Sequence, residues 1–276
     1  PAINFNLQRI LPIQMLRPVG ALPRWYDQLA LTYTANLDNK LSTTEERLYL
    51  ENIPALAGQA SNGMKHTAAL TSTFTNRFFS VNPEFRFTDR WYLETLRRTY
   101  LSAQDTVVSD TVGGFRRAGE WGAGATLTSK LYGMYSFRRG AIKAIRHTIT
   151  PSVGFAYRPD NSTRIEGPFG ANGALGSYSP FQIGIYGEPS VGESGSLNLG
   201  VIQNLEAKVR ERRNAPADSA AKEQKKQKVK LIDFLGINTS YDMLKDSLRW
   251  SSISVAARTT LANLITVNVN SAWDPY

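Results

Sequence analysis

The stretch that decides the fold of this chain is RHTITPSVGFAYR, which covers residues 146–158. Its apolar residues stand at alternate positions, at Ile149, Val153, Phe155 and Tyr157. The positions between them hold threonine, serine, glycine, alanine and finally arginine. Because successive side chains of a β-strand point to opposite faces, a period of two predicts a strand with one apolar face and one polar face.

The same alternation recurs along most of the chain, and no segment shows the 3.6-residue period of a useful amphipathic helix. We therefore predict an all-β protein built from antiparallel strands. About ten strands are expected, over residues 2–10, 25–37, 63–74, 79–96, 116–137, 145–158, 195–209, 230–242, 249–260 and 265–274.

Alternation alone does not separate a soluble β-sandwich from a transmembrane barrel, whose apolar face meets lipid. Many of the predicted strands reach the roughly 9–11 residues that a membrane strand needs, whereas globular strands have a mode of about 5–6. Aromatic residues gather toward the expected strand ends, and Arg9, Asp89 and Asp233 of the apolar face are expected there too. The pattern favours an outer-membrane β-barrel, here a partial wall of about ten strands, and the soluble sandwich stays open as an alternative.

Composition excludes several classes of protein. The 276 residues include 32 Lys+Arg against 23 Asp+Glu, a formal charge of +9, with no cysteine and two histidines. Without cysteine there are no disulfides, thiolate metal sites or cysteine nucleophiles. His66 and His147 lie on the apolar face of their predicted strands, and we expect both to be hydrogen-bonded structural residues. No nucleotide loop, G-x-S-x-G motif or other catalytic signature is present. We expect no enzyme, and no catalytic, metal or cofactor site.

The predicted connections assign sides to the wall. Antiparallel strands place successive connections on alternate sides, and outer-membrane barrels have short periplasmic turns and longer outer loops. The connections 38–62, 97–115 and 159–194 are long and share a side, which we assign as extracellular. We treat residues 1–276 as a single barrel segment with a long Gly-rich extracellular loop at 159–194, which covers the lumen as a lid or packs on its neighbours.

The connection 210–229 falls on the periplasmic side by the same rule. Residues 210–230 hold eight Lys/Arg and three Asp/Glu, a net charge of +5. Such a run is typical of a flexible, solvated insertion, and a docking site for an acidic periplasmic partner is the alternative. No aromatic residue interleaves the lysines and no nucleic-acid-binding motif accompanies them, so we expect no nucleic acid partner.

Several strings of this sequence resemble the barrel domain of the LPS-assembly protein LptD family, in the form found in its cysteine-poor members. The first is RHTITPSVGFAYRPD at 146–160, followed by NLEAKVR at 204–210 and by the Lys-rich insertion. The resemblance continues through SYD at 240–242, DSLRW at 246–250 and the terminal AWDPY, with NGMKH at 62–66 and RWY at 90–92 upstream. It covers nearly the whole chain.

The resemblance implies a function. Members of this family form a large outer-membrane barrel plugged by the lipoprotein LptE. The barrel receives lipopolysaccharide (LPS) from a periplasmic bridge and inserts it into the outer leaflet through a lateral opening. We therefore expect an LPS translocon integral to the cell outer membrane, with an LptE-like lipoprotein plug, the bridge components, LPS and outer-membrane lipid as partners. Two alternatives are a passive porin-type barrel and a soluble β-sandwich that binds glycans or acts as an adhesin. The chain opens on Pro1, and its ten strands are too few for the whole barrel, so we expect an internal piece whose edges and lateral gate are completed by polypeptide outside these residues.

The candidate site residues are the cations of the polar face. An inward-facing ammonium or guanidinium group makes charge-assisted hydrogen bonds to phosphate or carboxylate. The alternative for each is an ion pair with Glu84, Glu206 or Asp242. The residues expected to line the substrate path are Lys65, Arg86, Lys130, Arg146, Arg158 and Arg258.

Overall fold

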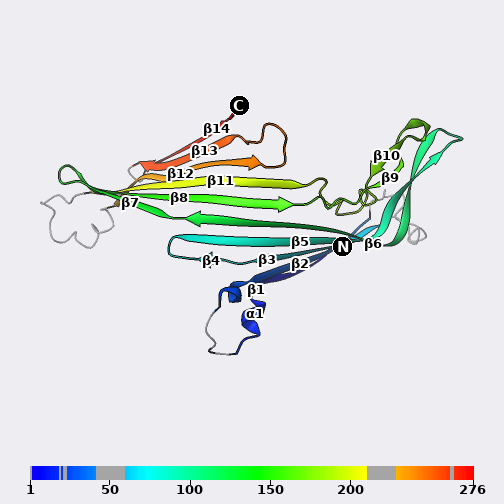
Figure 1. Cartoon of the computed structure of the whole chain (residues 1–276), viewed down its shortest axis with the longest axis horizontal. Coiled ribbons are helices and arrows are strands. Elements are labelled where there is room, and N and C mark those ends of the chain that lie inside the picture. The colour runs from blue at the N-terminus through cyan, green and yellow to red at the C-terminus, as the bar shows by residue number, and fades with distance from the viewer. Residues whose placement is uncertain (1, 19, 21–23, 42–59, 210–227, 262–263) are drawn as a thin grey trace. The chain divides into compact units, whose positions relative to one another are not determined.

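A computed structural model describes residues 2–18, 20, 24–41, 60–209, 228–261 and 264–276 (Figure 1). Within them the strands form one twelve-stranded sheet and one two-stranded sheet, which confirms the all-β prediction. The strands are β1 (Ala2–Ile10), β2 (Ala30–Lys40), β3 (Ser61–Thr71), β4 (Phe74–Thr75), β5 (Phe79–Leu101), β6 (Thr106–Ser129), β7 (Leu131–Ser136), β8 (Ile142–Arg158), β9 (Ile165–Pro168), β10 (Leu175–Tyr178), β11 (Ser194–Val209), β12 (Lys228–Asp242), β13 (Ile253–Leu261) and β14 (Ile265–Trp273).

Helices are few and short. They are α1 (Pro12–Met15) and the 3-10 helices η1 (Trp25–Gln28) and η4 (Ala171–Gly173). No helix among the described residues is long and apolar enough to cross a membrane. The strand predicted over 25–37 begins later than expected, because residues 25–28 form η1, and it continues to Lys40.

Neighbouring strands of the large sheet stand in the same order as in the sequence. The order is β1-β2-β3-β5-β6-β8-β11-β12-β13-β14, with β4 beside β5 and β7 beside β8. The ladders β1–β2, β2–β3 and β3–β5 are antiparallel, as are β11–β12, β12–β13 and β13–β14. This up-and-down order with no crossovers is the topology of an outer-membrane wall, and it is compatible with the predicted partial barrel.

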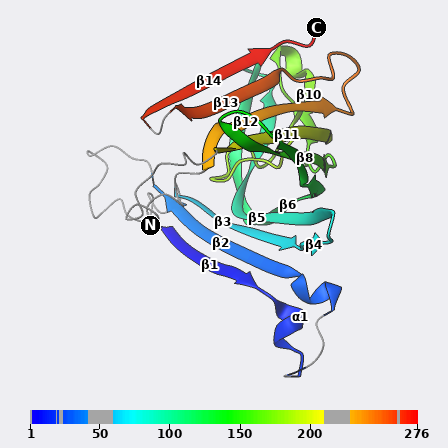
Figure 2. The same ribbon diagram turned by 90° about the vertical axis from the view of Figure 1, so that its left-hand side faces the viewer.

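The chain divides into two compact units, and strands β5, β6, β8 and β11 contribute residues to both. Unit 1 consists of Pro1–Ser72, Pro83–Ala123 and Tyr157–Ser194. Figure 2 shows its strands β1, β2 and β3 side by side, with α1 beyond the end of β1. Its small buried cluster joins Tyr92 of β5 and Ala118 of β6 to Phe181, which lies beyond β10.

Unit 2 consists of Thr73–Asn82, Gly124–Ala156 and Gly195–Tyr276. Strands β11 to β14 pair in sequence within it (Figure 1). The interstrand fit is close on the polar face, where a Cβ at Gly200 would lie 2.7 Å from Ser152 Oγ and 2.8 Å from Asn238 Oδ1. Glycine at this position therefore lets three strands place polar side chains against one another.

One predicted connection is wrong. Residues 97–115 are no long loop, because β5 and β6 run for 23 and 24 residues and meet in a short turn after Leu101. The connection predicted over 159–194 runs from the end of β8 to the start of β11, and β9 and β10 pair within it as a small hairpin. The strand predicted over 116–137 is divided at Lys130 into β6 and β7. Of the predicted basic insertion 210–229, residues 210–227 lie outside the described residues, and 228–229 begin β12.

Candidate functional site: the polar face

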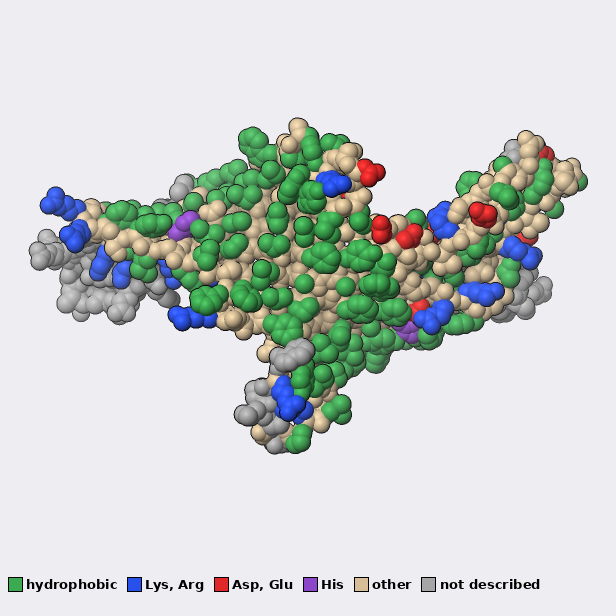
Figure 3. Space-filling model, viewed as in Figure 1, with side chains coloured by type: hydrophobic (Ala, Val, Ile, Leu, Met, Phe, Trp, Pro, Cys, Tyr) green, Lys and Arg blue, Asp and Glu red, His purple; other side chains and the backbone are tan. Residues whose placement is uncertain are grey.

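The ladders sort side chains onto two faces as the alternation predicts. Across β2, β3 and β5, Leu37, Met64 and Trp91 stand opposite one another on one face. The next register position places Asn36, Lys65 and Arg90 opposite one another on the other face. We call the first the apolar face and the second the polar face. In Figure 3 hydrophobic side chains cover much of the visible surface.

A row of five rings crosses the apolar face of unit 1. Neighbouring ring centroids are 6.2, 6.0, 4.2 and 5.7 Å apart across β1, β2, β3, β5 and β6. Rings on an exposed strand face are typical of the aromatic girdles of membrane barrels. The row consists of Phe5, Tyr33, His66, Trp91 and Phe115.

The apolar face also holds polar groups, among them residues that are hydrogen bonded. His66 Nδ1 lies 2.6 Å from Tyr33 Oη, and in unit 2 His147 Nε2 lies 3.0 Å from Gln203 Oε1, which confirms that both histidines are hydrogen bonded. Asp89 is not near a strand end as predicted, because β5 continues to Leu101. It lies 3.0 Å from Arg117 Nη2 and accepts a 2.8 Å hydrogen bond from Trp91 Nε1. These partners offset the cost of burying its charge.

The polar face of unit 1 carries a segment that we call the strap, residues 178–190. Phe181 packs on Tyr92 with ring centroids 5.3 Å apart, and Tyr92 Oη donates a 2.5 Å hydrogen bond to the Gly187 carbonyl. Tyr186 Oη lies 2.8 Å from both the Asn36 carbonyl and Asp38 Oδ2. At its end, Ser190 Oγ donates to Glu120 Oε1 at 2.9 Å. The strap therefore packs on β2, β5 and β6 and covers part of the polar face.

The strap also completes the edge of β5. The β3–β5 ladder ends at the pair Gly63–Tyr92, so the rest of β5 has no partner from β3. The backbone N–H of Leu96 donates to the Pro180 carbonyl at 2.8 Å, and that of Arg98 donates to Tyr178 Oη at 3.1 Å. The Arg98 guanidinium lies 4.9 Å from the Tyr178 ring centroid, so the edge contact is both polar and aromatic.

Beside the strap, charged side chains follow the polar face of unit 1 from strand to strand. Lys65 stands opposite Arg90, and Arg90 Nη2 lies 2.9 Å from Glu120 Oε2. Arg158 follows on β8, where its Cβ would lie 3.7 Å from a Cβ at Gly122. The Arg90 side chain is only 11% exposed, and no acceptor among the described residues bonds its Nε or Nη1 atoms. Because an unpaired buried donor is costly, these atoms are suited to an anionic group that enters beside the strap.

The six predicted path residues separate into three kinds. Lys65 and Arg158 belong to the row just described, and Lys65 Nζ lies 6.0 Å from the Tyr186 ring centroid. Arg86 and Arg146 form ion pairs with Glu84 at 2.7 Å and with Glu206 at 2.8 Å, as the alternative reading had it.

The other two predicted cations are exposed. Lys130 lies between β6 and β7, and Arg258 stands on β13 opposite Phe234. Asp242, the third proposed ion-pair partner, lies 4.0 Å from Lys245 instead. The six cations divide between the two units: Lys65, Arg86 and Arg158 belong to unit 1, and Lys130, Arg146 and Arg258 to unit 2.

Sequence reasoning missed Arg90 and Glu120. Arg90 follows the same alternation as Arg86 and was therefore detectable from the pattern. Glu120 was not, because its role depends on the strap residue Ser190, which lies 70 positions away in the chain.

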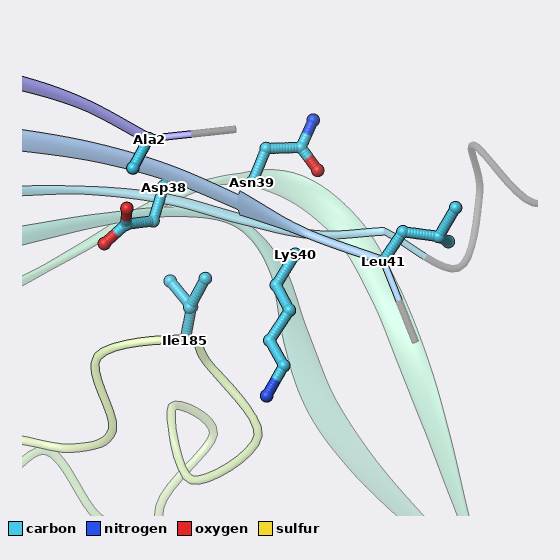
Figure 4. Close-up of a pocket in the computed structure, with 6 residues that line it drawn as sticks. All are labelled: Ala2, Asp38, Asn39, Lys40, Leu41 and Ile185. Carbon is cyan, nitrogen blue, oxygen red and sulfur yellow. The ribbon is translucent and has the colours of Figure 1, made fainter. Parts of the chain in front are cut away.

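A groove opens where the strap approaches the ends of β1 and β2. Its volume is about 630 Å³, and it is lined by Ala2, residues 38–41 and Ile185. Figure 4 shows Asp38, Lys40 and Ile185 around a common space, while Asn39 points away from it. Burial, followed by the hydrogen bond to Asp38, raises the pKa of the neighbouring Tyr186 hydroxyl, so this hydroxyl stays protonated as a donor. Among the described residues, no group of three or more His, Asp or Glu is placed to hold a metal ion.

The long antiparallel strands and their two faces define the class: a strand wall of the outer-membrane kind. A protein-family model described as "LptD protein" matches residues 1–276, and the chain belongs to that family. Membership supports a role in LPS transport and outer-membrane assembly, and it indicates the outer membrane as the location. No curated protein and no solved structure matches the chain.

Proposed function

We propose that this chain forms part of the wall of an outer-membrane LPS translocon, which inserts LPS into the outer leaflet. Its partners are an LptE-like lipoprotein plug and the components of a periplasmic bridge. In this arrangement residues 159–194 lie on the extracellular side and residues 210–229 on the periplasmic side. The chain acts as a transporter wall and has no catalytic role.

The observation that carries the proposal is the polar face of unit 1. Its uncharged part offers exchangeable hydrogen bonds to sugars, as in the register Thr34, Thr67 and Thr88. Lys65, Arg90 and Arg158 offer charge-assisted hydrogen bonds to phosphate. A phosphorylated, sugar-rich head group stays hydrated along such a face, while the opposite face meets lipid.

Photocrosslinking from neighbouring positions of β3 tests this function. Thr67 belongs to the polar face and Ala68 to the apolar face, where it stands opposite Phe87. A photoreactive amino acid at position 67 is expected to capture LPS in cells that are making LPS, and the capture is expected to stop when LPS synthesis is blocked. The same amino acid at position 68 is expected to capture resident lipid under both conditions.

Two results would contradict the proposal. If position 67 never captures LPS and the protein conducts ions in a planar bilayer, the result would support the porin instead. A protein that stays in solution without detergent would contradict a membrane wall of either kind.

A further inference from the structure

One part of unit 2 carries positive charge with no acidic residue. Residues 73–82 and 124–156 contain six Lys or Arg and no Asp or Glu. All of them are described, and the six account for much of the chain's formal charge of +9. We call them the basic rim: Arg77, Lys130, Arg138, Arg139, Lys143 and Arg146.

The rim lies where strands turn. The Asn76 N–H donates to the Phe79 carbonyl and closes the turn that holds Arg77. The Phe137 N–H donates to the Lys143 carbonyl and closes the β7–β8 hairpin, which holds Arg138 and Arg139. Ser129 Oγ donates a 2.6 Å hydrogen bond to the Phe78 carbonyl and so places Lys130 close to the first turn. Figure 3 shows Lys and Arg side chains gathered at this end of unit 2, at the left of the view.

The cations of the rim are solvent-exposed. Arg146 lies 2.8 Å from Glu206, which belongs to β11, and its side chain remains 49% exposed. The other five are exposed residues of turns and strand ends. A patch with six cations and no acidic residue of its own has a positive potential that attracts anions.

Exposed aromatic side chains accompany the cations. Phe78 is 69% and Tyr132 67% exposed, and Tyr135 and Phe137 are exposed as well. The Arg77 guanidinium lies 5.7 Å from the Phe78 ring centroid. Rings mixed with long cationic side chains are typical of the zone where a membrane protein meets lipid head groups. A soluble acidic partner would not need this apolar component.

The opposite end of unit 2 has a different charge pattern. Between β12 and β13, Lys245 Nζ lies 4.0 Å from Asp242, and Arg249 Nη1 lies 3.0 Å from Tyr241 Oη. Asp242 and Asp246 balance the two cations of this connection. The positive charge is therefore a property of one end and not of strand connections in general.

We propose that the basic rim binds the phosphate head groups of anionic glycerophospholipids in the membrane leaflet at its own end of unit 2. The inference rests on the membrane-wall function proposed above, in which this end faces the periplasm. Cations near an anionic membrane surface each add about 1 kcal/mol of attraction, and the neighbouring rings fix the depth at which the strand ends sit.

A matched pair of double variants tests the site. Arg139→Gln with Lys143→Gln removes one Arg and one Lys from the rim, and Lys245→Gln with Arg249→Gln removes the same charges from the opposite end. The full chain is purified in detergent and mixed with phosphatidylglycerol or phosphatidylethanolamine, and lipid retention is measured by native mass spectrometry. The rim variant is expected to bind phosphatidylglycerol roughly thirty-fold more weakly, with phosphatidylethanolamine unchanged, and the control variant is expected to match the parent chain.

Three outcomes would overturn the proposal. Equal losses in the two double variants would show a general effect of net charge. Equal retention of the two lipids by the parent chain would show that the rim does not select anionic head groups. Preferential retention of LPS by the rim, or of an acidic protein with no lipid selectivity, would assign it another ligand.

The lipid test and the crosslinking test fail separately. Lipid selectivity at the rim does not require LPS on the polar face. A porin with a selective rim would therefore retain phosphatidylglycerol preferentially and capture no LPS at position 67. A translocon without a selective rim would capture LPS at position 67 and retain the two phospholipids equally.

Discussion

At the scale of single residues, the strap depends on a glycine that touches a ring. A Cβ at Gly184 would overlap the Tyr92 ring, which lies in the buried cluster with Phe181. We predict that Gly184→Ala destabilises the docked strap by about 1–3 kcal/mol, the usual cost of overpacking. Limited proteolysis in detergent measures the effect as faster cleavage within residues 178–190. Gly113→Ala is the control, because a Cβ there meets nothing within 4 Å, and equal protection of both variants would contradict the packing argument.

The hydroxyl of Tyr186 makes strap docking depend on pH. Burial raises its pKa above the ordinary value near 10, so the folded state holds the proton more tightly than the unfolded state does. The resulting stability is complete below that ordinary value and falls as the pH rises past it. We predict that cleavage within the strap accelerates between pH of about 9 and 11, and that Tyr186→Phe, which has no proton to lose, shows a smaller acceleration. A variant as pH-sensitive as the parent chain would assign the effect to another group.

At the scale of elements, the two faces of one strand are expected to tolerate charge differently. Val269 of β14 belongs to the apolar face opposite Ala257, and Asn270 to the polar face opposite Ala256. Both side chains are exposed. We predict that Val269→Arg costs about 2–4 kcal/mol near the bilayer midplane and lowers the amount of assembled protein, whereas Asn270→Arg assembles normally. Heat-modifiable gel mobility of membrane fractions measures assembly, and equal yields would contradict the assignment of faces.

The strands also show which structural features the two-residue period predicts and which it misses. It assigned Lys65 to the polar face and His66 to the apolar face, as the ladders show, because strand geometry fixes the side of every second residue. It missed the continuation of β5 and β6 through 97–115, where Arg97 and Thr99 of β5 occupy positions of the apolar face. The strap was missed for another reason. Its contacts join Tyr186 to Asp38 and Phe181 to Tyr92, and no local pattern encodes pairs so far apart in the chain.

At the scale of the whole molecule, family membership predicts which partners copurify with the protein. We expect the protein, extracted from membranes in detergent, to copurify with a lipoprotein in equal amounts and with bound LPS. Mass spectrometry and a lipid assay of the purified fraction measure both. A preparation that holds neither and conducts ions would support the porin-type alternative.

The cover that the strap gives to β5 has a practical consequence for surface display. Leu96 and Arg98 donate their backbone N–H groups to the strap, so foreign peptide inserted between Tyr178 and Gly187 would uncover a strand edge and invite aggregation. The turn at residues 102–104 is exposed, and none of the strap contacts described above involves it. An epitope tag placed there would report which side of the membrane this end of the wall faces, in intact cells and without disturbing the wall itself.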